Sequence, residues 1–390
     1  MVLTQRSHAR RPTLEDVARR SGVSKSTVSR VINGEDRVRP EVVDRVRHAV
    51  TELGYVPNQA ARQLVTHRTG AVAVVAAQPE NRLFLDQFFD LLLRGVRREL
   101  ALHGAQAVLL FVEEPDDYPR VADYLGGGHV DGAILFSLRP GDRLAEIVGR
   151  LGVPAVFGGR PLPHDRAGEH PGQARVDGDN RGGARLAVQH LVSLGRRRIA
   201  TVAGPYDQEN SAADRLAGYR DVLGDGASPH LVERADYTRQ GGADAMAALL
   251  DRSPGLDAVF VASDLMASGA LQTLRERGRR VPEDVAVVGF DDLTSIAETT
   301  DPPLTTVHQD AEEMGRLMVR LLLDPATGRT DPATGRTDPV TGRTDPATGR
   351  TDPATGRTGP ADGSPRRSPD GPPGAPSVIV PTRLVRRASA

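Results

Sequence analysis

A short polar segment near the N-terminus carries residue types that can bind nucleic acid. Residues 25–30 read Lys-Ser-Thr-Val-Ser-Arg. In a helix, Val28 would point inward while the polar side chains face outward. Lysine and arginine neutralise phosphates, and serine, threonine and arginine can also hydrogen-bond to base edges. The chemistry expected of this segment is therefore contact with the DNA backbone and reading of bases.

Two short helices must hold this segment in place. Thr13 and Asp16 have the spacing of a capping box at the start of the first helix, and Gly22 permits the left-handed turn that ends it. Ser24 can cap a second helix, which we expect from residue 25 to about residue 33. The predicted apolar faces of the two helices comprise Leu14, Val17, Ala18, Val28, Val31 and Ile32.

A third helix completes the expected N-terminal domain. Pro40 suits its first turn and Gly54 suits its end. Its predicted inward residues are Val42, Val43, Val46 and Val50. The three helices form a helix-turn-helix pattern, in which the second helix enters the major groove. Compact three-helix domains without DNA function show the same caps and apolar stripes, which is the alternative interpretation.

The charge distribution favours DNA binding. Residues 1–68 contain 13 Lys and Arg against 7 Asp and Glu, although the whole chain has a formal net charge of -1. A basic segment on a mildly acidic body is expected of a protein that sends one end to a polyanion. Lys25 is the only lysine, and we attribute the excess of arginine mainly to the codon bias of a G+C-rich genome.

The sequence argues against several other classes of protein. With no cysteines, the chain has no disulfides, zinc ribbons or thiol catalysis. It has no apolar run long enough to span a bilayer and no apolar signal segment in residues 1–11, so we expect a cytoplasmic, nucleoid-associated protein. Dehydrogenase, hydrolase and zinc-protease motifs are missing, and the 10 histidines, among them His190 and His308, lack ligand spacing. We expect no catalytic residues, no metal and no other cofactor.

Beyond residue 70, apolar runs alternate with amphipathic stretches of helical spacing. This order predicts parallel sheets covered by helices. A stretch of roughly 250 residues is too long for one mononucleotide-type fold and suits two α/β lobes with a ligand cleft between them. The predicted strands and helices cover residues 71–77, 88–103, 107–112, 133–137, 154–157, 182–194, 199–203, 212–223, 243–250, 258–262, 267–278 and 285–290.

The N-terminal residues also carry a family resemblance. Thr13 to Leu64, TLEDVARRSGVSKSTVSRVINGEDRVRPEVVDRVRHAVTELGYVPNQAARQL, closely resembles the DNA-binding headpiece and hinge of the LacI/GalR family of repressors. The resemblance implies that residues 58–65 form a hinge helix that folds when two copies meet in the minor groove. Leu64 would be its apolar wedge between base pairs, or otherwise an ordinary linker leucine. The implied DNA-binding residues are Thr13, Ser24, Lys25, Ser26, Thr27, Ser29, Arg30, Asn33, Asn58, Ala61 and Leu64.

The rest of the chain resembles the effector domain of the same family, which shares its fold with periplasmic sugar-binding proteins. The segments that carry this resemblance are DGAILFS, GVPAVFGGR, DGDNRGGARLAVQHL, RLAGY, VFVASDLMASGAL and VPEDVAVVGFDD. We expect the chain to cross between the lobes near residues 175–177, 290–306 and 381. The expected fold is an all-α helix-turn-helix domain with a hinge helix, followed by a two-lobed, periplasmic-binding-protein-like α/β domain with parallel sheets.

A sugar-like effector needs planar charged or amide groups that chelate neighbouring hydroxyls and aromatic faces that cover the ring. Positions that match the family supply such groups at expected strand ends. By this resemblance, the effector-binding residues are Asp86, Phe88, Phe89, Arg160, Arg215, Tyr237, Ser263, Asp264, Asp291 and Gln309. Structural alternatives exist: the two phenylalanines as core residues, Arg215 as the partner of a structural acid, and Asp291 as a turn cap.

The sequence departs from the family pattern around these positions. Gly159 stands where an aspartate is common before Arg160, and Ser263 stands where asparagine often precedes Asp264. Residues 86–87 are Asp-Gln in place of the usual Asn-Pro. These departures indicate that the effector differs from the familiar sugars of the family.

A low-complexity segment interrupts the body near its end. It begins with five copies of DPATGRT, one of which has Val340 for alanine, and proline and glycine in every copy exclude a coiled coil. The expected regions are a disordered arm at 1–12, the helix-turn-helix domain at 13–56, the hinge helix and linker at 57–69, the effector-binding and dimerisation domain at 70–323 and 377–390, and a disordered insertion at 324–376.

These features together predict a transcription regulator, specifically a repressor. It would bind a pseudo-palindromic operator in double-stranded DNA as a homodimer, controlled by a sugar or sugar derivative in the inter-lobe cleft. Effector and DNA would then share one coupling free energy. The alternative is a small-solute-binding protein without DNA function, which fits the body but leaves the basic N-terminal domain unexplained.

Overall fold

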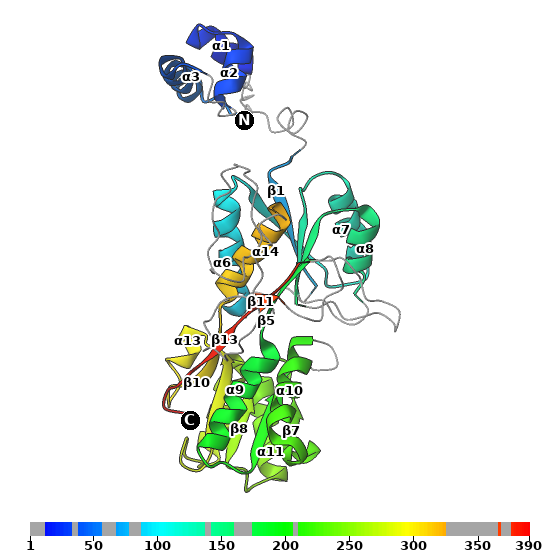
Figure 1. Cartoon of the computed structure of the whole chain (residues 1–390), viewed down its shortest axis with the longest axis vertical. Helices are drawn as coiled ribbons and strands as arrows, with labels where there is room; N and C mark the ends of the chain where they lie inside the picture. Colours follow the sequence, from blue (N-terminus) through cyan, green and yellow to red (C-terminus); the bar gives the residue numbers. More distant parts are fainter. Residues whose placement is uncertain are drawn as a thin grey trace, which may run out of the picture. The chain divides into compact units, whose positions relative to one another are not determined.

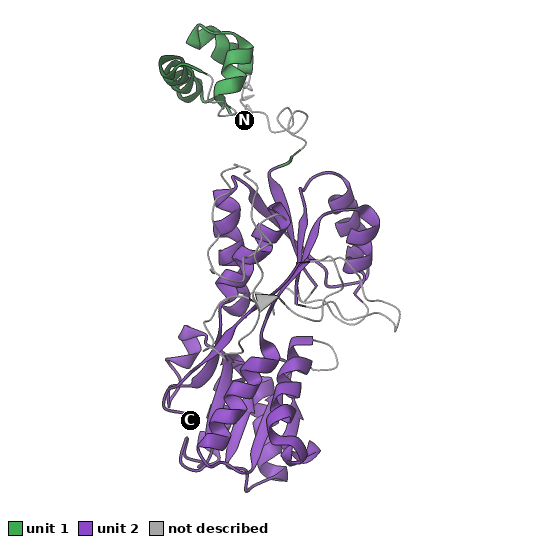
Figure 2. Cartoon of the chain, in the orientation of Figure 1, with its two compact units in different colours: residues 1–69 green, residues 70–390 purple. Residues whose placement is uncertain are grey.

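The computed structural model divides the chain into two compact units. Unit 1 ends at Thr69 and unit 2 begins at Gly70 (Figure 2). We call unit 1 the headpiece and unit 2 the body. The structure describes residues 12–32, 38–56, 68–77, 87–136, 142–159, 174–205, 210–324, 366–367 and 376–390.

The described part of the headpiece consists of helices α1 (Leu14–Ser21), α2 (Lys25–Ile32) and α3 (Pro40–Leu53). These are the three helices predicted from caps and apolar spacing. Their shared core is small and consists of Val17, Ala18, Val28, Val46 and Ala49. Val31 and Ile32 of the predicted apolar face are partly buried against this core.

The predicted caps are present. The Thr13 hydroxyl accepts from the backbone N–H of Asp16, and the Asp16 carboxylate accepts from the backbone N–H of Thr13. Gly22 and Gly54 follow α1 and α3 with φ of 69° and 62°, a left-handed conformation that glycine adopts without steric cost. Local sequence chemistry therefore sets the ends of these helices.

The body is built on two sheets. The first contains β1 (Ala71–Ala76), β2 (Gln106–Phe111), β3 (Ala133–Phe136), β4 (Ala155–Gly158), β5 (Ala174–Gly178), β11 (Arg366–Arg367) and β12 (Ser377–Val380). The second contains β6 (Ile199–Ala203), β7 (Val232–Arg234), β8 (Ala258–Val261), β9 (Ala286–Asp291), β10 (Thr305–Gln309) and β13 (Thr382–Val385). We call the parts built on them lobe 1 and lobe 2.

The strand orders are β11-β12-β5-β4-β3-β1-β2 in lobe 1 and β13-β10-β9-β8-β6-β7 in lobe 2. The pairings are parallel except for β11 with β12 and β10 with β13. Parallel strands covered on both faces are apolar throughout, and the run AVAVVA of β1 is an example. The predicted two-lobed parallel α/β fold is confirmed.

Helices cover both faces of each sheet. Lobe 1 carries α6 (Gln87–Leu102), α7 (Asp117–Gly126), α8 (Leu144–Leu151) and α14 (Ala311–Leu323). Lobe 2 carries α9 (Asn180–Ser193), α10 (Asn210–Leu223), α11 (Arg239–Arg252), α12 (Asp264–Glu276) and the short α13 (Thr294–Ala297). In lobe 1, α6 and α14 lie on one face of the sheet, and α7 and α8 lie on the other (Figure 1). In lobe 2, α11 and α12 pack on one face, and α9 and α10 pack on the other.

In the parts of the chain that the structure describes, there are three crossings between the lobes. The crossing after β5 and the crossing at Pro381, between β12 and β13, agree with expectation. The crossing expected within residues 290–306 is wrong. Thr305–Gln309 still pairs with β9 as a strand of lobe 2, and the chain passes to α14 of lobe 1 only at Asp310.

Two further observations concern the remaining predictions. Within the segment 324–376, expected to be a disordered insertion, Arg366–Arg367 forms a strand antiparallel to β12. The DPATGRT copies beyond Asp324 lie outside the described residues, as does the predicted hinge helix at 58–65. None of the helices in the described stretches is long and apolar enough to cross a membrane.

Candidate DNA-binding helix and effector site

Helix α2 presents its polar residues at the surface of the headpiece. Ser24, Lys25, Ser26 and Arg30 are exposed, whereas Val28 is fully buried. The Ser24 hydroxyl accepts from the backbone N–H of Thr27 at 3.2 Å, and it also lies 2.8 Å from the hydroxyls of Ser26 and Thr27. Ser24 therefore caps α2 as predicted, which fixes the start of the helix and the direction in which the next side chains point.

Lys25 has an acidic neighbour on α1. Its Nζ lies 3.0 Å from a carboxylate oxygen of Glu15, and both side chains are more than half exposed, at 57% and 60%. An exposed pair of this kind contributes at most about 1 kcal/mol. Lys25 can therefore exchange Glu15 for a DNA phosphate or base at little cost.

The structure brings together three of the predicted effector residues at the carboxyl ends of lobe 2 strands. Arg215 on α10 is 6% exposed, Asp291 at the end of β9 is 8% exposed and Gln309 at the end of β10 is 4% exposed. Arg215 Nη1 lies 3.4 Å from Asp291 Oδ1, and the Gln309 amide donates to the same oxygen at 2.6 Å. Ligands of α/β proteins bind outside the carboxyl ends of the strands, where this cluster lies.

Arg215 is held from three further sides. Its Nε donates to Asn180 Oδ1 at 2.9 Å, and its Nη1 donates to the Ala262 carbonyl at 2.5 Å. Its guanidinium carbon lies 3.8 Å from the centre of the Phe290 ring. A planar guanidinium held in this way is pre-oriented for bidentate hydrogen bonding.

Asn180 ties the cluster to lobe 1. Its amide nitrogen donates to Asp177 Oδ1 at 3.0 Å and to the Gly178 carbonyl at 3.2 Å, both at the end of β5. Gly178 also allows a close approach of Gln309, because a Cβ atom at position 178 would lie 2.8 Å from Gln309 Oε1. The cluster therefore sits at the junction of the two lobes.

The side chains of Ser263 and Asp264 form hydrogen bonds within the protein. Ser263 caps α12, its hydroxyl accepting from the Met266 N–H at 3.2 Å. Asp264 is 0% exposed, and its two oxygens accept from the Thr306 hydroxyl at 2.5 Å and the Leu293 N–H at 2.8 Å. Burial, aided by the charge of Asp291, raises the pKa of Asp264 well above its usual range. Asp264 has no surface to offer a ligand in this structure.

The turn after β9 contains two successive residues with positive φ, Asp291 at 109° and Asp292 at 57°. Such conformations are costly for residues other than glycine. Two side chains contact the Asp292 carboxylate: His308 Nδ1 lies 3.1 Å from Oδ2, and Arg387 Nη2 lies 2.8 Å from Oδ1. Burial acts to raise the pKa of Asp292, but these two partners outweigh it and leave the pKa below its ordinary value.

The predicted aromatic residues have mixed environments. Phe89 is 8% exposed and belongs to the core of lobe 1, and Phe88 packs edge-on against it with ring centres 5.7 Å apart. Tyr237 has φ of 64°, and its ring lies so close to Gly204, just after β6, that a Cβ atom there would meet it at 2.4 Å. Tyr237 is thus at a strand end of lobe 2, whereas Phe89 serves the core.

Sequence comparison agrees with both parts of this description. A family model described as bacterial regulatory proteins, lacI family, matches residues 13–58. A model of the periplasmic binding protein-like domain matches residues 188–344. The HTH-type transcriptional regulator CelR of Thermobifida fusca is 49% identical over 326 residues, which cover 82% of this chain and 94% of CelR. The chain belongs to the LacI family of bacterial regulatory proteins. It is therefore a DNA-binding transcription regulator and not an enzyme.

Two solved structures of LacI-family proteins are similar to the whole chain. A complex of the transcriptional regulator CelR with cellobiose is 42% identical, has a TM-score of 0.66, and covers 97% of this chain and 100% of its own. A Lac repressor dimer bound to operator and the anti-inducer ONPF is 27% identical, has a TM-score of 0.72, and covers 97% of this chain and 98% of its own.

Several predicted residues of this LacI-family chain lie outside the described residues. They are Asn33, Asn58, Ala61 and Leu64 of the DNA-binding set and Asp86 and Arg160 of the effector set. Conversely, Asn180 and Asp177 complete the strand-end cluster but were not predicted from the sequence. A signal was present, because both occur in the polar DGDN run at the carboxyl end of β5, and ligand-site residues of α/β folds are found at such strand ends.

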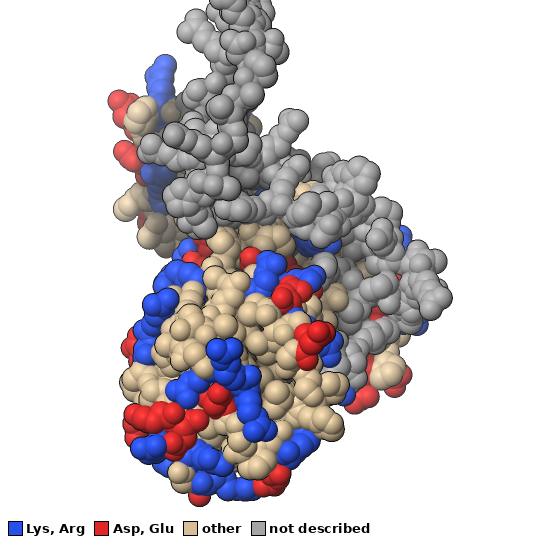
Figure 3. Space-filling view, turned by 60° about the horizontal axis from the view of Figure 1, so that its bottom comes forward, with Lys and Arg blue, Asp and Glu red and all other residues tan. Residues whose placement is uncertain are grey.

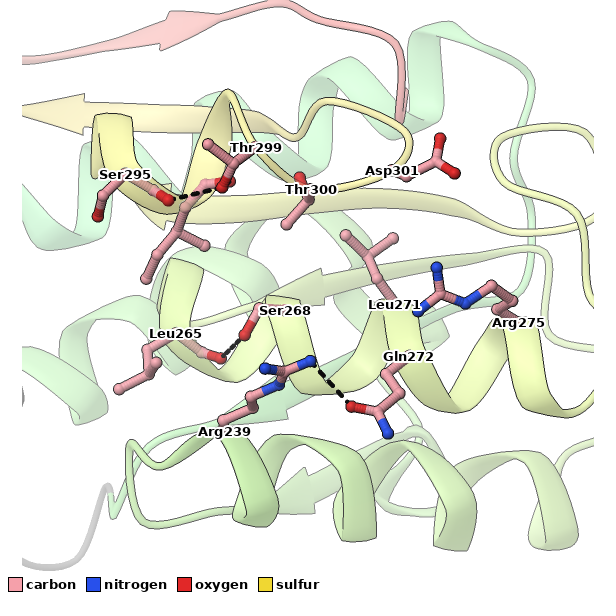
Figure 4. A pocket seen from close by; sticks show the side chains of 11 residues that line it. Arg239, Leu265, Ser268, Leu271, Gln272, Arg275, Ser295, Thr299, Thr300 and Asp301 are labelled. Atoms are coloured by element: carbon pink, nitrogen blue, oxygen red, sulfur yellow. Dashed lines mark hydrogen bonds between the residues drawn. The ribbon is translucent and has the colours of Figure 1, made fainter.

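A separate pocket of about 360 Å³ opens on lobe 2 of the LacI-family body. Figure 4 shows it between α12 and the segment that follows α13, with Arg239 Nη2 donating to Gln272 Oε1 at 3.0 Å at its rim. The residues that line it are Arg239, Leu265, Ser268, Leu271, Gln272, Arg275, Ser295, Ile296, Thr299, Thr300 and Asp301. None of the predicted effector residues that the structure describes lines this pocket, which is therefore distinct from the strand-end cluster.

The surface charges of the body are mixed. Figure 3 shows Lys and Arg interspersed with Asp and Glu on the face in view. Ion pairs on lobe 2 include Arg277 with Asp251 and Arg280 with Asp284, each at 2.6 Å. Within the described ranges, no group of three or more His, Asp or Glu side chains could hold a metal ion.

Proposed function

We propose that this LacI-family regulator is a cytoplasmic, nucleoid-associated repressor. It binds a pseudo-palindromic operator as a homodimer and senses cellobiose or a closely related disaccharide. The observation that carries the proposal is the cluster of Arg215, Asp291 and Gln309 at the strand ends, fixed to lobe 1 through Asn180. The cluster places side chains that can hydrogen-bond to sugar hydroxyls where the two lobes meet.

The composition of the cluster supports a sugar effector. A guanidinium, a carboxylate and an amide can each form two hydrogen bonds to adjacent hydroxyls, and Tyr237 offers an aromatic face at a neighbouring strand end. The CelR structure that covers 97% of this chain holds cellobiose, which makes cellobiose the first sugar to test.

The geometry of α2 supports operator reading. Lys25, Ser26 and Arg30 are exposed on one short helix whose start is fixed by Ser24, as a recognition helix requires. A two-fold dimer places two such helices on two half-sites, so the operator repeats as an inverted pair. The Lac repressor structure contains a dimer on its operator. We assign the hinge role to residues 58–65 and the wedge role to Leu64.

The three crossings between the lobes give the effector a means of control. A ligand that bridges the strand-end cluster and lobe 1 favours one angle between the lobes, because the crossings are the points about which the lobes can turn. Lobe angle then sets the spacing of the two headpieces in the dimer. Effector and operator are thereby linked by one coupling free energy.

The test is a fluorescence-anisotropy titration of the purified protein with labelled DNA from upstream of its own and neighbouring genes, at stated salt. Each titration is repeated with cellobiose, glucose, ribose and lactose. We expect tight binding that resists competitor DNA and changes with cellobiose alone. Sedimentation of the protein–DNA complex should give two chains per operator.

The outcomes separate the parts of the proposal. Specific DNA binding that no sugar alters would support the proposed DNA-binding function and contradict the proposed sugar effector. Cellobiose binding by calorimetry without specific DNA binding would favour a solute-binding protein. One chain per operator would overturn the dimer.

A further inference from the structure

Asp264 is fully buried next to the strand-end cluster, yet it touches no other member of the cluster through a hydrogen bond among the described contacts. Its oxygens accept instead from Leu293 N–H and the Thr306 hydroxyl. Gly289 leaves room for it, because a Cβ atom there would lie 2.3 Å from Asp264 Oδ1. Three chain segments therefore close around one carboxyl group: the start of α12, the turn after β9, and β10.

The segment tied by Asp264 is the one that carries Asp291. Leu293 directly follows the two residues with positive φ, at 109° and 57°. A turn in this conformation persists only where its surroundings hold it. Arg215 and Gln309 hold Asp291, and His308 and Arg387 hold Asp292. Asp264 restrains the other end of the turn, by accepting a hydrogen bond from the backbone N–H of Leu293.

We infer that Asp264 is a positioning residue of the effector site: it does not contact the effector but fixes the turn 291–293, so that Asp291 meets Arg215 and Gln309 in the geometry that binds the ligand. The inference rests on the proposed effector site and replaces the sequence-based expectation that Asp264 touches the ligand. Asp264 acts through the backbone of Leu293 and through Thr306, neither of which needs to contact the effector.

The decisive comparison uses four variants of the full-length protein. D264A removes both acceptors. D264N is the conservative variant, since its amide oxygen can accept from Leu293 N–H and its amide nitrogen can donate to Thr306 Oγ1. T306V removes the hydroxyl that donates to Asp264, at a threonine that is itself 0% exposed. T201V is the matched control, because Thr201 is 1% exposed in the same sheet and its hydroxyl has no hydrogen-bond partner among the described residues.

Two readouts are measured: cellobiose affinity by calorimetry, and hydrogen exchange of peptides that cover residues 291–297 in effector-free protein. We expect D264A to weaken cellobiose binding about tenfold or more, the scale of a lost buried hydrogen bond together with the strain that it restrains. Exchange at 291–297 should become faster. D264N should restore most of both, T306V should shift both in the same direction by less, and T201V should change neither.

Contrary results are equally specific. Hydrogen exchange at 291–297 that is unchanged in both D264A and T306V would overturn the inference. A D264N protein with normal exchange that binds cellobiose as poorly as D264A would also overturn it, because that result indicates direct contact between Asp264 and the sugar. If D264A does not fold, T306V decides alone. If the wild-type protein does not bind cellobiose, the proposed effector is wrong, whereas the exchange comparison still decides whether Asp264 holds the turn.

Discussion

The two surfaces to which we assign functions are built in opposite ways. The reading residues Lys25, Ser26 and Arg30 are exposed on a helix of eight residues, over a core of five buried side chains. The effector residues Arg215, Asp291 and Gln309 are each less than 9% exposed and bonded to one another. A side chain on the first surface can change without opening a gap in the core, whereas a change in the second spreads through the cluster.

The largest expected effect is that of R215A. It leaves the buried Asp291 carboxylate and the Asn180 amide without their guanidinium partner, and removing one member of a buried pair costs about 3–5 kcal/mol. The free energy of unfolding should fall accordingly, and cellobiose should no longer alter operator affinity. R220A, an exposed arginine on the same helix, is the control and should behave as wild type. A stable R215A protein with a normal cellobiose response would show that the cluster is less coupled than its contacts suggest.

The next effect is on the exposed surface. R30A should weaken operator binding by about 1–3 kcal/mol, the contribution of a base-reading arginine, with cellobiose affinity and stability unchanged. Anisotropy and calorimetry measure the two affinities. R19A on α1 removes an equal charge from the headpiece and should weaken operator binding less. Equal operator affinity in R30A and wild type would remove Arg30 from the reading surface.

The stability of the buried region should also respond to pH. Because the pKa of Asp264 is raised in the native state, native protein retains a proton that the unfolded chain releases above its pKa of about 3.9. Native stability should therefore fall as pH rises from there to the native pKa, by up to about 1.4 kcal/mol per pH unit.

D264N lacks this proton and isolates its contribution. In urea unfolding at a series of pH values, the stability of D264N relative to wild type should increase as pH rises and then become constant. A difference that does not vary with pH would mean that Asp264 titrates in the native state as it does in the unfolded chain.

A smaller effect is expected from E15Q. Loss of the exposed pair with Lys25 frees the lysine for DNA, so operator affinity should rise by less than about 1 kcal/mol. E41Q removes the same charge from α3, where Glu41 is also exposed, and corrects for the general effect of charge. If the two variants increase affinity equally, the Lys25–Glu15 pair does not restrain DNA binding.

The smallest effect is expected from deletion of residues 331–358, four of the five DPATGRT copies. The sequence predicts a loop insertion here, and shortening a loop costs little, so operator affinity, cellobiose response and the number of chains per operator should all stay within about twofold of wild type. A lost dimer would instead assign the repeat a role in assembly.

Much of the fold could be predicted because its signals are local. Caps at Thr13 and Ser24, glycines after α1 and α3, and apolar runs such as AVAVVA depend on neighbouring residues alone. The crossing after β10 was misplaced because membership of Thr305–Gln309 in lobe 2 is decided by pairing with β9, a non-local contact. Helices α7 and α8 were not identified at all.

The effector site was predicted in part for the same reason. Family resemblance supplied Arg215, Asp291 and Gln309, and the structure brings them together. It could not show that Asp264 faces inward, because the identity of a residue does not reveal whether its hydrogen bonds are made inside the protein. Nor did the resemblance identify Asn180. This residue matters because it links Arg215 to the end of β5 in lobe 1, a contact between distant segments of the chain.

The Lys25–Glu15 pair has a consequence for chemistry at amines. In 390 residues, Lys25 is the only lysine, and its side chain is 57% exposed at the start of α2. Any reagent or enzyme that acts on lysine side chains can therefore modify this protein at one position, on the helix that we propose reads DNA. Acylation there would remove the positive charge of that helix nearest Ser24, and a fluorophore attached there should report operator occupancy from a single known site.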